Sequence, residues 1–179
     1  VMRKWYGNFE NIVNLLNDGF DIKQSVINFR LRDPVFYMRE AVTWTQVTSG
    51  NFSCRYVPTG ILFGDGGPVS FFSRRLKYNL GLLNSKVSMS ILSILAPTIN
   101  YGPEQIKRIP YIVGNENVVE IIVTENIQIS KIDWDSFETS WDFKRHPLFC
   151  GTTKISDAFA RWQQYTYSQF AQLKANEEE

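Results

Sequence analysis

Residues 78–112 decide the fold, and they read YNLGLLNSKVSMSILSILAPTINYGPEQIKRIPYI. Apolar side chains recur here at three- and four-residue spacing, which predicts a helix over 78–95 with one buried stripe: Leu80, Leu83, Val87, Ile91 and Ile94. Pro97 ends this helix because proline has no N–H to give to another helical turn. The stretch is therefore expected to begin with a long core helix.

The second half of the same stretch predicts a short basic turn. Pro103 suits the first position of a helical turn, and Glu104 complements the dipole of that turn. We expect Ile106 to face inward with Ile109, and Lys107 to face outward with Arg108. The result is a rigid platform with a cationic edge.

The rest of the chain predicts an α+β domain followed by helices. Before the long helix, a short amphipathic helix is expected over 9–16, stopped by Asn17-Asp18-Gly19. Short β-rich runs separated by Gly, Pro and Asn predict an antiparallel meander over 41–47, 52–57, 61–63 and 69–72, with a further strand at 109–113. Helices are expected around 118–123 and 159–173, the second capped by Ser156. The predicted fold is a short twisted, mainly antiparallel sheet with packed helices and a helical extension.

Charge divides the chain into two parts. The formal net charge is +1 over 179 residues. Residues 1–113 hold 13 Lys and Arg against 7 Asp and Glu, whereas residues 114–179 hold 6 against 11. A basic first part is typical of a polyanion binder, although ordinary solvated charge gives the same counts. We take the polar loop at 114–117 as the boundary between the two parts.

Few signals of compartment or cofactor are present. Cys54 and Cys150 lie far apart, and His146 is the single histidine, so neither a disulfide framework nor a zinc site is indicated. No basic and apolar leader opens the sequence, and no uncharged run approaches ~18 residues. We expect a cytoplasmic protein without membrane contact. The last helix is still amphipathic at Glu177-Glu178-Glu179, which suggests that the sequence is cut from a longer one.

Two short motifs resemble motifs that bind a cofactor or a substrate base. Phe63-Gly64-Asp65-Gly66-Gly67 is glycine-rich like a loop that holds S-adenosylmethionine, but it lacks the following crossover helix, so a tight hairpin is expected. Asp33-Pro34-Val35-Phe36 is similar to the Asp/Asn-Pro-Pro-aromatic motif that holds a flipped adenine, but Val35 replaces the second proline. We therefore expect no catalytic residue and no cofactor site in this chain.

An acidic cluster is the remaining catalytic candidate. Carboxylates that hold Mg²⁺ next to a lysine are typical of a nuclease, and the sequence offers Asp133, Asp135, Glu138, Asp142 and Lys144. Trp134, Phe137 and Trp141 are spaced as one apolar helical face, however, which would turn the acidic groups to solvent. A packed helical linker is the simpler interpretation.

Four stretches carry a resemblance to a known family: KWYGN at 4–8, VTWTQVTSGNFSCRYVPTGILFGDGGP at 42–68, LLNSKVSMSILSILAPTINYGPEQIKRIP at 82–110 and ISKIDWDSFETSWDFKRHPL at 129–148. They are similar to the target recognition domain and following linker of large adenine-specific DNA methyltransferases, namely single-chain restriction-modification enzymes and BREX-type phage-defence methylases. The resemblance implies a target recognition domain over 1–113 and a helical linker over 114–179. It also implies double-stranded DNA and a catalytic domain of the same parent chain as partners, with S-adenosylmethionine as the parent's cofactor.

Candidate DNA contacts follow from side-chain chemistry. Cations that track a phosphate backbone flank the long helix: Arg74, Arg75, Lys77, Lys107 and Arg108. Amides and guanidiniums that suit base edges are expected in loops: Asn51, Arg55, Asn100 and Gln105. Each of these is also a common turn-forming or capping residue. The alternatives are a protein-interaction scaffold that docks a defence-complex partner through its aromatic acidic half, and a Mg²⁺-dependent nuclease fragment.

Overall fold

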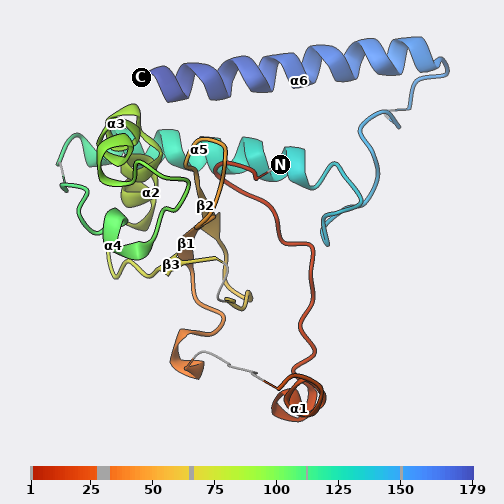
Figure 1. Ribbon diagram of the computed structural model, residues 1–179. Coiled ribbons are helices and arrows are strands. Elements are labelled where there is room, and N and C mark those ends of the chain that lie inside the picture. Colours follow the sequence, from red (N-terminus) through yellow and green to blue (C-terminus); the bar gives the residue numbers. More distant parts are fainter. Residues whose placement is uncertain (1, 28–32, 65–66, 112, 150) are drawn as a thin grey trace.

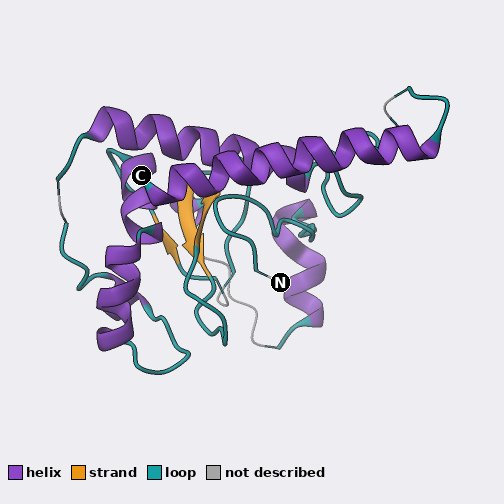
Figure 2. Ribbon diagram, turned by 90° about the horizontal axis from the view of Figure 1, so that it is seen from above, coloured by secondary structure: helices purple, strands orange, loops and turns teal. Residues whose placement is uncertain are grey.

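The computed structural model describes residues 2–27, 33–64, 67–111, 113–149 and 151–179. In these ranges β1 (Ala41–Trp44), β2 (Cys54–Val57) and β3 (Val69–Ser70) form a three-stranded antiparallel sheet in the order β2-β1-β3. Helix α2 packs on β1 and β2, α5 packs on α2, and α6 lies along α5 (Figures 1 and 2). The predicted α+β class with a helical extension is confirmed.

The strands are shorter than the sequence suggests and do not form a simple meander. No strand forms at residues 61–63, and β3 pairs with β1 instead of the preceding β2. The outer edge of β2 is occupied by Trp5, whose N–H donates to the Cys54 carbonyl at 3.0 Å and whose carbonyl accepts from the Tyr56 N–H at 2.8 Å. β3 therefore joins the sheet on the opposite side of β1.

The expected long helix is broken at Ser85 into α2 (Leu76–Asn84) and α3 (Lys86–Leu95). The Ser85 hydroxyl accepts from the Ser88 N–H at 3.1 Å and donates to the Leu82 carbonyl at 2.7 Å, so it ends one helix and caps the next. The break changes which face is buried. The predicted single stripe is wrong beyond Ser85, because Val87 and Ile94 are 52% and 79% exposed while Leu92 is buried.

The basic turn forms as expected. Helix α4 (Pro103–Ile106) has proline in its first turn together with Glu104. Ile106 and Ile109 pack against the core, and Lys107 is exposed. The strand expected at 109–113 is wrong: its described residues are irregular, and residue 112 lies outside the described ranges.

The second part begins with α5 (Glu116–Trp134), capped by the Asn115 side chain, which accepts from the Val118 N–H. Residues 135–142 then form successive turns, so the predicted apolar helical face through Phe137 and Trp141 is wrong. The Lys131 ammonium draws these turns together by pairing with Asp135 and with Asp142. Trp141 is consequently 67% exposed.

Two further helix boundaries differ from expectation. Helix α1 (Leu16–Ser25) begins where the expected 9–16 helix would have ended, and Asn17, Asp18 and Gly19 have left-handed backbone angles at its start. Helix α6 (Ile155–Glu178) follows Lys154 without a side-chain cap, so the expected capping by Ser156 is wrong. None of the described helices combines the length and apolar character that a bilayer crossing requires.

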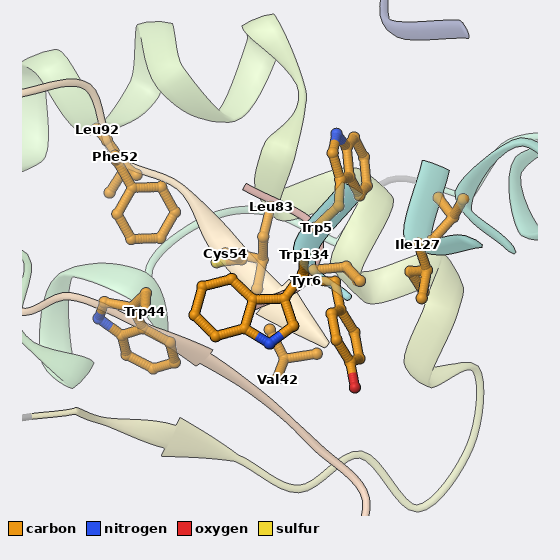
Figure 3. Close-up of a cluster of buried hydrophobic side chains, with 12 residues drawn as sticks. Trp5, Tyr6, Val42, Trp44, Phe52, Cys54, Leu83, Leu92, Ile127 and Trp134 are labelled. Carbon is orange, nitrogen blue, oxygen red and sulfur yellow. The ribbon is translucent and has the colours of Figure 1, made fainter. Parts of the chain in front are cut away.

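The core joins both parts of the chain. Figure 3 shows Trp5, Trp44 and Phe52 around β1 and β2, with Trp134 and Ile127 entering from α5. Cys54 is fully buried in this cluster, and its burial raises the pKa of the thiol. Cys150 lies outside the described residues.

Candidate nucleic-acid interface

The first basic segment lies at the start of α2. Arg75 is the residue before the helix, with a left-handed φ of 58°. Its Nε atom pairs with the Glu116 carboxylate at 2.8 Å, and Nη1 donates to the Tyr111 hydroxyl at 3.5 Å. The hydrogen bond to Tyr111 and the charge of Glu116 raise the pKa of Arg75. Arg74 is exposed and Lys77 is half-buried.

The second basic segment follows α4. Lys107 and Arg108 are both exposed, as the sequence predicts. The Lys107 ammonium pairs with the Glu104 carboxylate at 2.9 Å, one turn earlier. An ion pair between two exposed side chains contributes at most about 1 kcal/mol to stability. The Lys107 ammonium therefore stays accessible to another anion.

A cavity of about 280 Å³ lies between α2, β3 and α4. Lys107 lines this cavity, and so does Tyr111, which accepts the hydrogen bond from Arg75. Asn79 of α2 and Ser70 of β3 complete its polar wall. Of the five candidate phosphate contacts, Lys107 lines this cavity, and Arg75 is linked to it through Tyr111. Arg74, Lys77 and Arg108 are not among its described lining residues.

The candidate base-reading residues are divided between surface and core. Asn51 and Asn100 are exposed on neighbouring loops, which are joined by a backbone bridge between Val47 and Asn100. Gln105 is half-buried, and its Oε1 atom lies 2.8 Å from where a side chain on Gly102 would begin. These three amides remain candidates for base contacts.

Arg55 does not lie in a loop, which corrects the expectation from sequence. It belongs to β2 and is 6% exposed. Its guanidinium donates to the Arg3 carbonyl and to the Thr45 hydroxyl, each at 3.3 Å. Burial lowers the pKa of Arg55. Its donors hold the first residues of the chain against the sheet.

Gln46 and Arg39 lie near these candidates in the structure but were not candidate contacts in the sequence. Gln46 lines a second cavity of about 390 Å³, next to the first, because Val69 and Pro103 line both. Arg39 holds its guanidinium over the Phe71 ring, with 5.1 Å between Cζ and the ring centroid. The available signal was positional: Arg39 and Gln46 flank the two ends of β1, and the chain at Gln46 is bonded to Tyr101, beside the loop that carries Asn100.

The residues that suggest catalysis have structural partners. Asp33 accepts from the Val35 N–H at 3.0 Å and starts the 3₁₀ turn η1 (Pro34–Phe36). Residues 63–64 and 67 belong to the loop between β2 and β3, not to the expected tight hairpin between two strands, and residues 65–66 lie outside the described ranges.

Three of the four carboxylates in the acidic cluster, namely Asp133, Asp135 and Asp142, are paired with cations. Asp133 pairs with Arg3, and Asp142 pairs with Lys131 at 2.8 Å. Burial alone would lower the pKa of Lys131, but its hydrogen bonds to Asp135 and Asp142 raise it, and Lys131 in turn lowers the pKa of Asp142. Among the described residues, no group of three or more His, Cys, Asp or Glu side chains could hold a metal ion.

Comparison with known proteins tests the resemblance found in the sequence. The chain is 35% identical over 182 residues to adenine-specific methyltransferase BrxX of Escherichia coli O9:H4 (strain HS), an alignment that covers 98% of the chain and 15% of BrxX. It is 36% identical over 193 residues to adenine-specific methyltransferase PglX of Lacticaseibacillus casei (strain Zhang), covering 100% of the chain and 16% of PglX.

The chain is homologous to one segment of these BREX adenine-specific methyltransferases. The predicted resemblance is thereby confirmed, although no protein-family model matches the chain. The chain spans about 15% of the length of BrxX and 16% of the length of PglX. A segment of that size is consistent with one part of a large methyltransferase.

Proposed function

We propose that this chain is the sequence-recognition segment of an adenine-specific DNA methyltransferase that acts in phage defence. Residues 1–113 bind double-stranded DNA, and residues 114–179 form the helical linker to the next part of the enzyme. The observation that carries the proposal is the cavity between α2 and α4, which is lined by Lys107 and by Tyr111, the hydrogen-bond acceptor of Arg75. The homology to adenine-specific methyltransferases makes DNA the appropriate polyanion.

The proposed mechanism separates recognition from chemistry. A catalytic domain elsewhere in the parent chain binds S-adenosylmethionine and transfers the methyl group to adenine in the cytoplasm. The present segment binds DNA phosphates and selects the DNA sequence that is methylated. Arg74, Lys77, Lys107 and Arg108 contact phosphates. Arg75 can contact a phosphate as well, but its charge is partly neutralised by its pair with Glu116. Base edges are read by the surface amides of Asn51, Asn100 and Gln105, and Arg55 supports the sheet.

The salt dependence of DNA binding tests this proposal. Each phosphate contact contributes about 0.9 to the slope of log affinity against log salt concentration. Replacing Arg74, Arg75 and Lys77 together with glutamine should therefore lower that slope by up to about 2.7, measured by fluorescence anisotropy on duplex DNA.

A matched variant controls for total charge. Lys144, Arg145 and Lys154 are exposed and lie in the acidic part, so their triple glutamine variant should keep the slope of the unmodified chain. An equal loss of slope in both variants would show that the DNA surface lies elsewhere.

A protein-interaction scaffold is the second candidate function, and exposed aromatic side chains favour it. Trp141 and Tyr167 are 67% and 73% exposed in the second part. A scaffold of this kind would show no salt-dependent affinity for duplex DNA, so the same titration separates the two functions.

A further inference from the structure

The cavity of about 390 Å³ beside β3 has an unusual lining. Its described walls consist of apolar side chains and glycine, with the single polar side chain of Gln46: the other lining residues are Phe36, Phe63, Gly64, Gly67, Pro68, Val69, Phe71 and Pro103. An apolar pocket with one amide selects a ligand that is largely flat and apolar but carries a hydrogen-bonding edge.

The aromatic wall is already arranged for stacking. Phe36 and Phe71 are stacked with ring centroids 5.2 Å apart, and Phe63 meets the Phe71 ring edge-on at 5.4 Å. Phe36 is nevertheless 40% exposed, so the wall is open to a ligand. The Arg39 guanidinium lies over Phe71 and adds a cation at the rim of the pocket. Aromatic rings next to arginine are the groups on which unstacked bases rest in nucleic-acid complexes.

The amide of Gln46 is presented from a fixed backbone. The Gln46 carbonyl accepts from the Tyr101 N–H at 2.6 Å, and two residues later the Thr48 N–H donates to the Ile99 carbonyl at 3.0 Å. A glutamine amide offers one acceptor and two donors side by side, which can pair with the edge of a nucleobase. The pocket also lies next to the basic cavity through Val69 and Pro103.

We propose that this pocket receives one unstacked nucleobase of the bound DNA. The ring rests on the exposed Phe36, which is backed by Phe71. The Gln46 amide meets its hydrogen-bonding edge, and Arg39 faces the adjoining phosphate. The inference rests on the proposed DNA-binding function, because the same DNA must reach Lys107 on the other side of Pro103. Charge complementarity favours this occupant, since Arg39 lies over Phe71 of this pocket and Lys107 lines the neighbouring cavity.

An unpaired base provides the direct test. A base inside a duplex must break its pairing and stacking before it enters a pocket, whereas a bulged base has already lost its pairing. Three duplexes of one sequence are compared with the complete chain: fully paired, with one unpaired adenine, and with an unpaired abasic nucleotide in its place. We expect the adenine bulge to bind at least about tenfold more tightly than either of the others, which corresponds to about 1.4 kcal/mol.

Variants assign this preference to the pocket. Gln46→Leu keeps the side-chain size and removes the amide, and Phe36→Ala removes an exposed part of the wall. With each variant, the affinity for the adenine-bulge duplex should approach the affinity for the fully paired duplex. Gln163→Leu, on the exposed surface of α6, should keep the ratio of the unmodified chain.

The outcomes separate this inference from the proposed function. Tight binding of the paired duplex with no bulge preference overturns the nucleobase pocket alone, and equal binding of the abasic bulge does the same because it assigns the preference to DNA bending. A preference that survives both pocket variants places the base elsewhere. Absence of binding to every duplex overturns the proposed function itself.

Discussion

Asn84 and Arg55 have side chains that could bind base edges, but their hydrogen bonds are made inside the protein. The Asn84 amide accepts from the Cys54 N–H at 2.8 Å and donates to the Cys54 carbonyl at 3.1 Å, while Arg55 bonds Arg3 and Thr45. Both side chains are more than nine-tenths buried. Asn84 gives the Cys54 N–H its acceptor, and Arg55 ties the first residues of the chain to the sheet. At these positions polar chemistry therefore serves the fold.

Asn84→Ala should lower the free energy of unfolding by about 1–3 kcal/mol, because it leaves the buried Cys54 N–H without its acceptor. Urea unfolding followed by tryptophan fluorescence measures the change. The control is Asn117→Ala, which truncates an exposed asparagine on α5. A loss for Asn84→Ala no larger than that of the control would contradict the role of this amide.

At the scale of elements, α2 and α5 pack tightly against each other at Gly81. A methyl group added to Gly81 would lie 2.8 Å from Val123 Cγ2 and 3.0 Å from Val119 Cγ1. Val123 is buried and its branched side chain has few alternative rotamers. Gly81 therefore sets the distance at which α5 lies on α2.

Gly81→Ala sets two effects against each other. Alanine favours a helix over glycine by about 0.8–1.0 kcal/mol, but overpacking a filled contact costs typically about 1–3 kcal/mol. We expect net destabilisation, seen as a lower midpoint of thermal unfolding. Gly64→Ala is the control, since its added methyl group meets no atom within 4 Å. A higher midpoint for Gly81→Ala would mean that α5 moves away freely.

Elements set by local sequence were predictable, and those set by distant contacts were not. Pro103 and Glu104 specify α4 within four residues, which is why the outward direction of Lys107 and Arg108 could be predicted. The break at Ser85 follows Asn84, whose amide binds a strand 30 residues earlier in the chain. The same holds for the candidate site: Arg55 is buried by contact with Arg3, and the pocket around Gln46 closes only when α4 reaches β3.

At the scale of the whole molecule, the last turn of α6 is fastened to the first residues of the chain. The Trp5 indole N–H donates to the Glu177 carboxylate at 2.6 Å, and the Lys4 ammonium pairs with it at 2.9 Å. Asn176 adds bonds to Glu125 and Asn126, both at 2.9 Å. Much of α6 is otherwise exposed, so these polar contacts fix its position over α5 (Figure 1).

Glu177→Ala should release the end of α6. Hydrogen bonds to charged groups are worth about 1.5–3 kcal/mol, so backbone amides in the last two turns should exchange with solvent roughly tenfold to a hundredfold faster. Hydrogen exchange with mass spectrometry detects this change. Glu178→Ala serves as the control because that carboxylate pairs with Lys174, at 3.8 Å on the same helix. Equal exchange in the two variants would show that α6 is held by other contacts.

The contact between Trp5 and Glu177 joins residues 172 positions apart in sequence. Polypeptide that passes through both residues therefore enters and leaves the unit at one place, as in domains that tolerate insertion into a longer chain. Under the proposed function, we expect that a graft of residues 4–177 into a homologous enzyme keeps the contact between Trp5 and Glu177 and changes the DNA sequence that the host modifies.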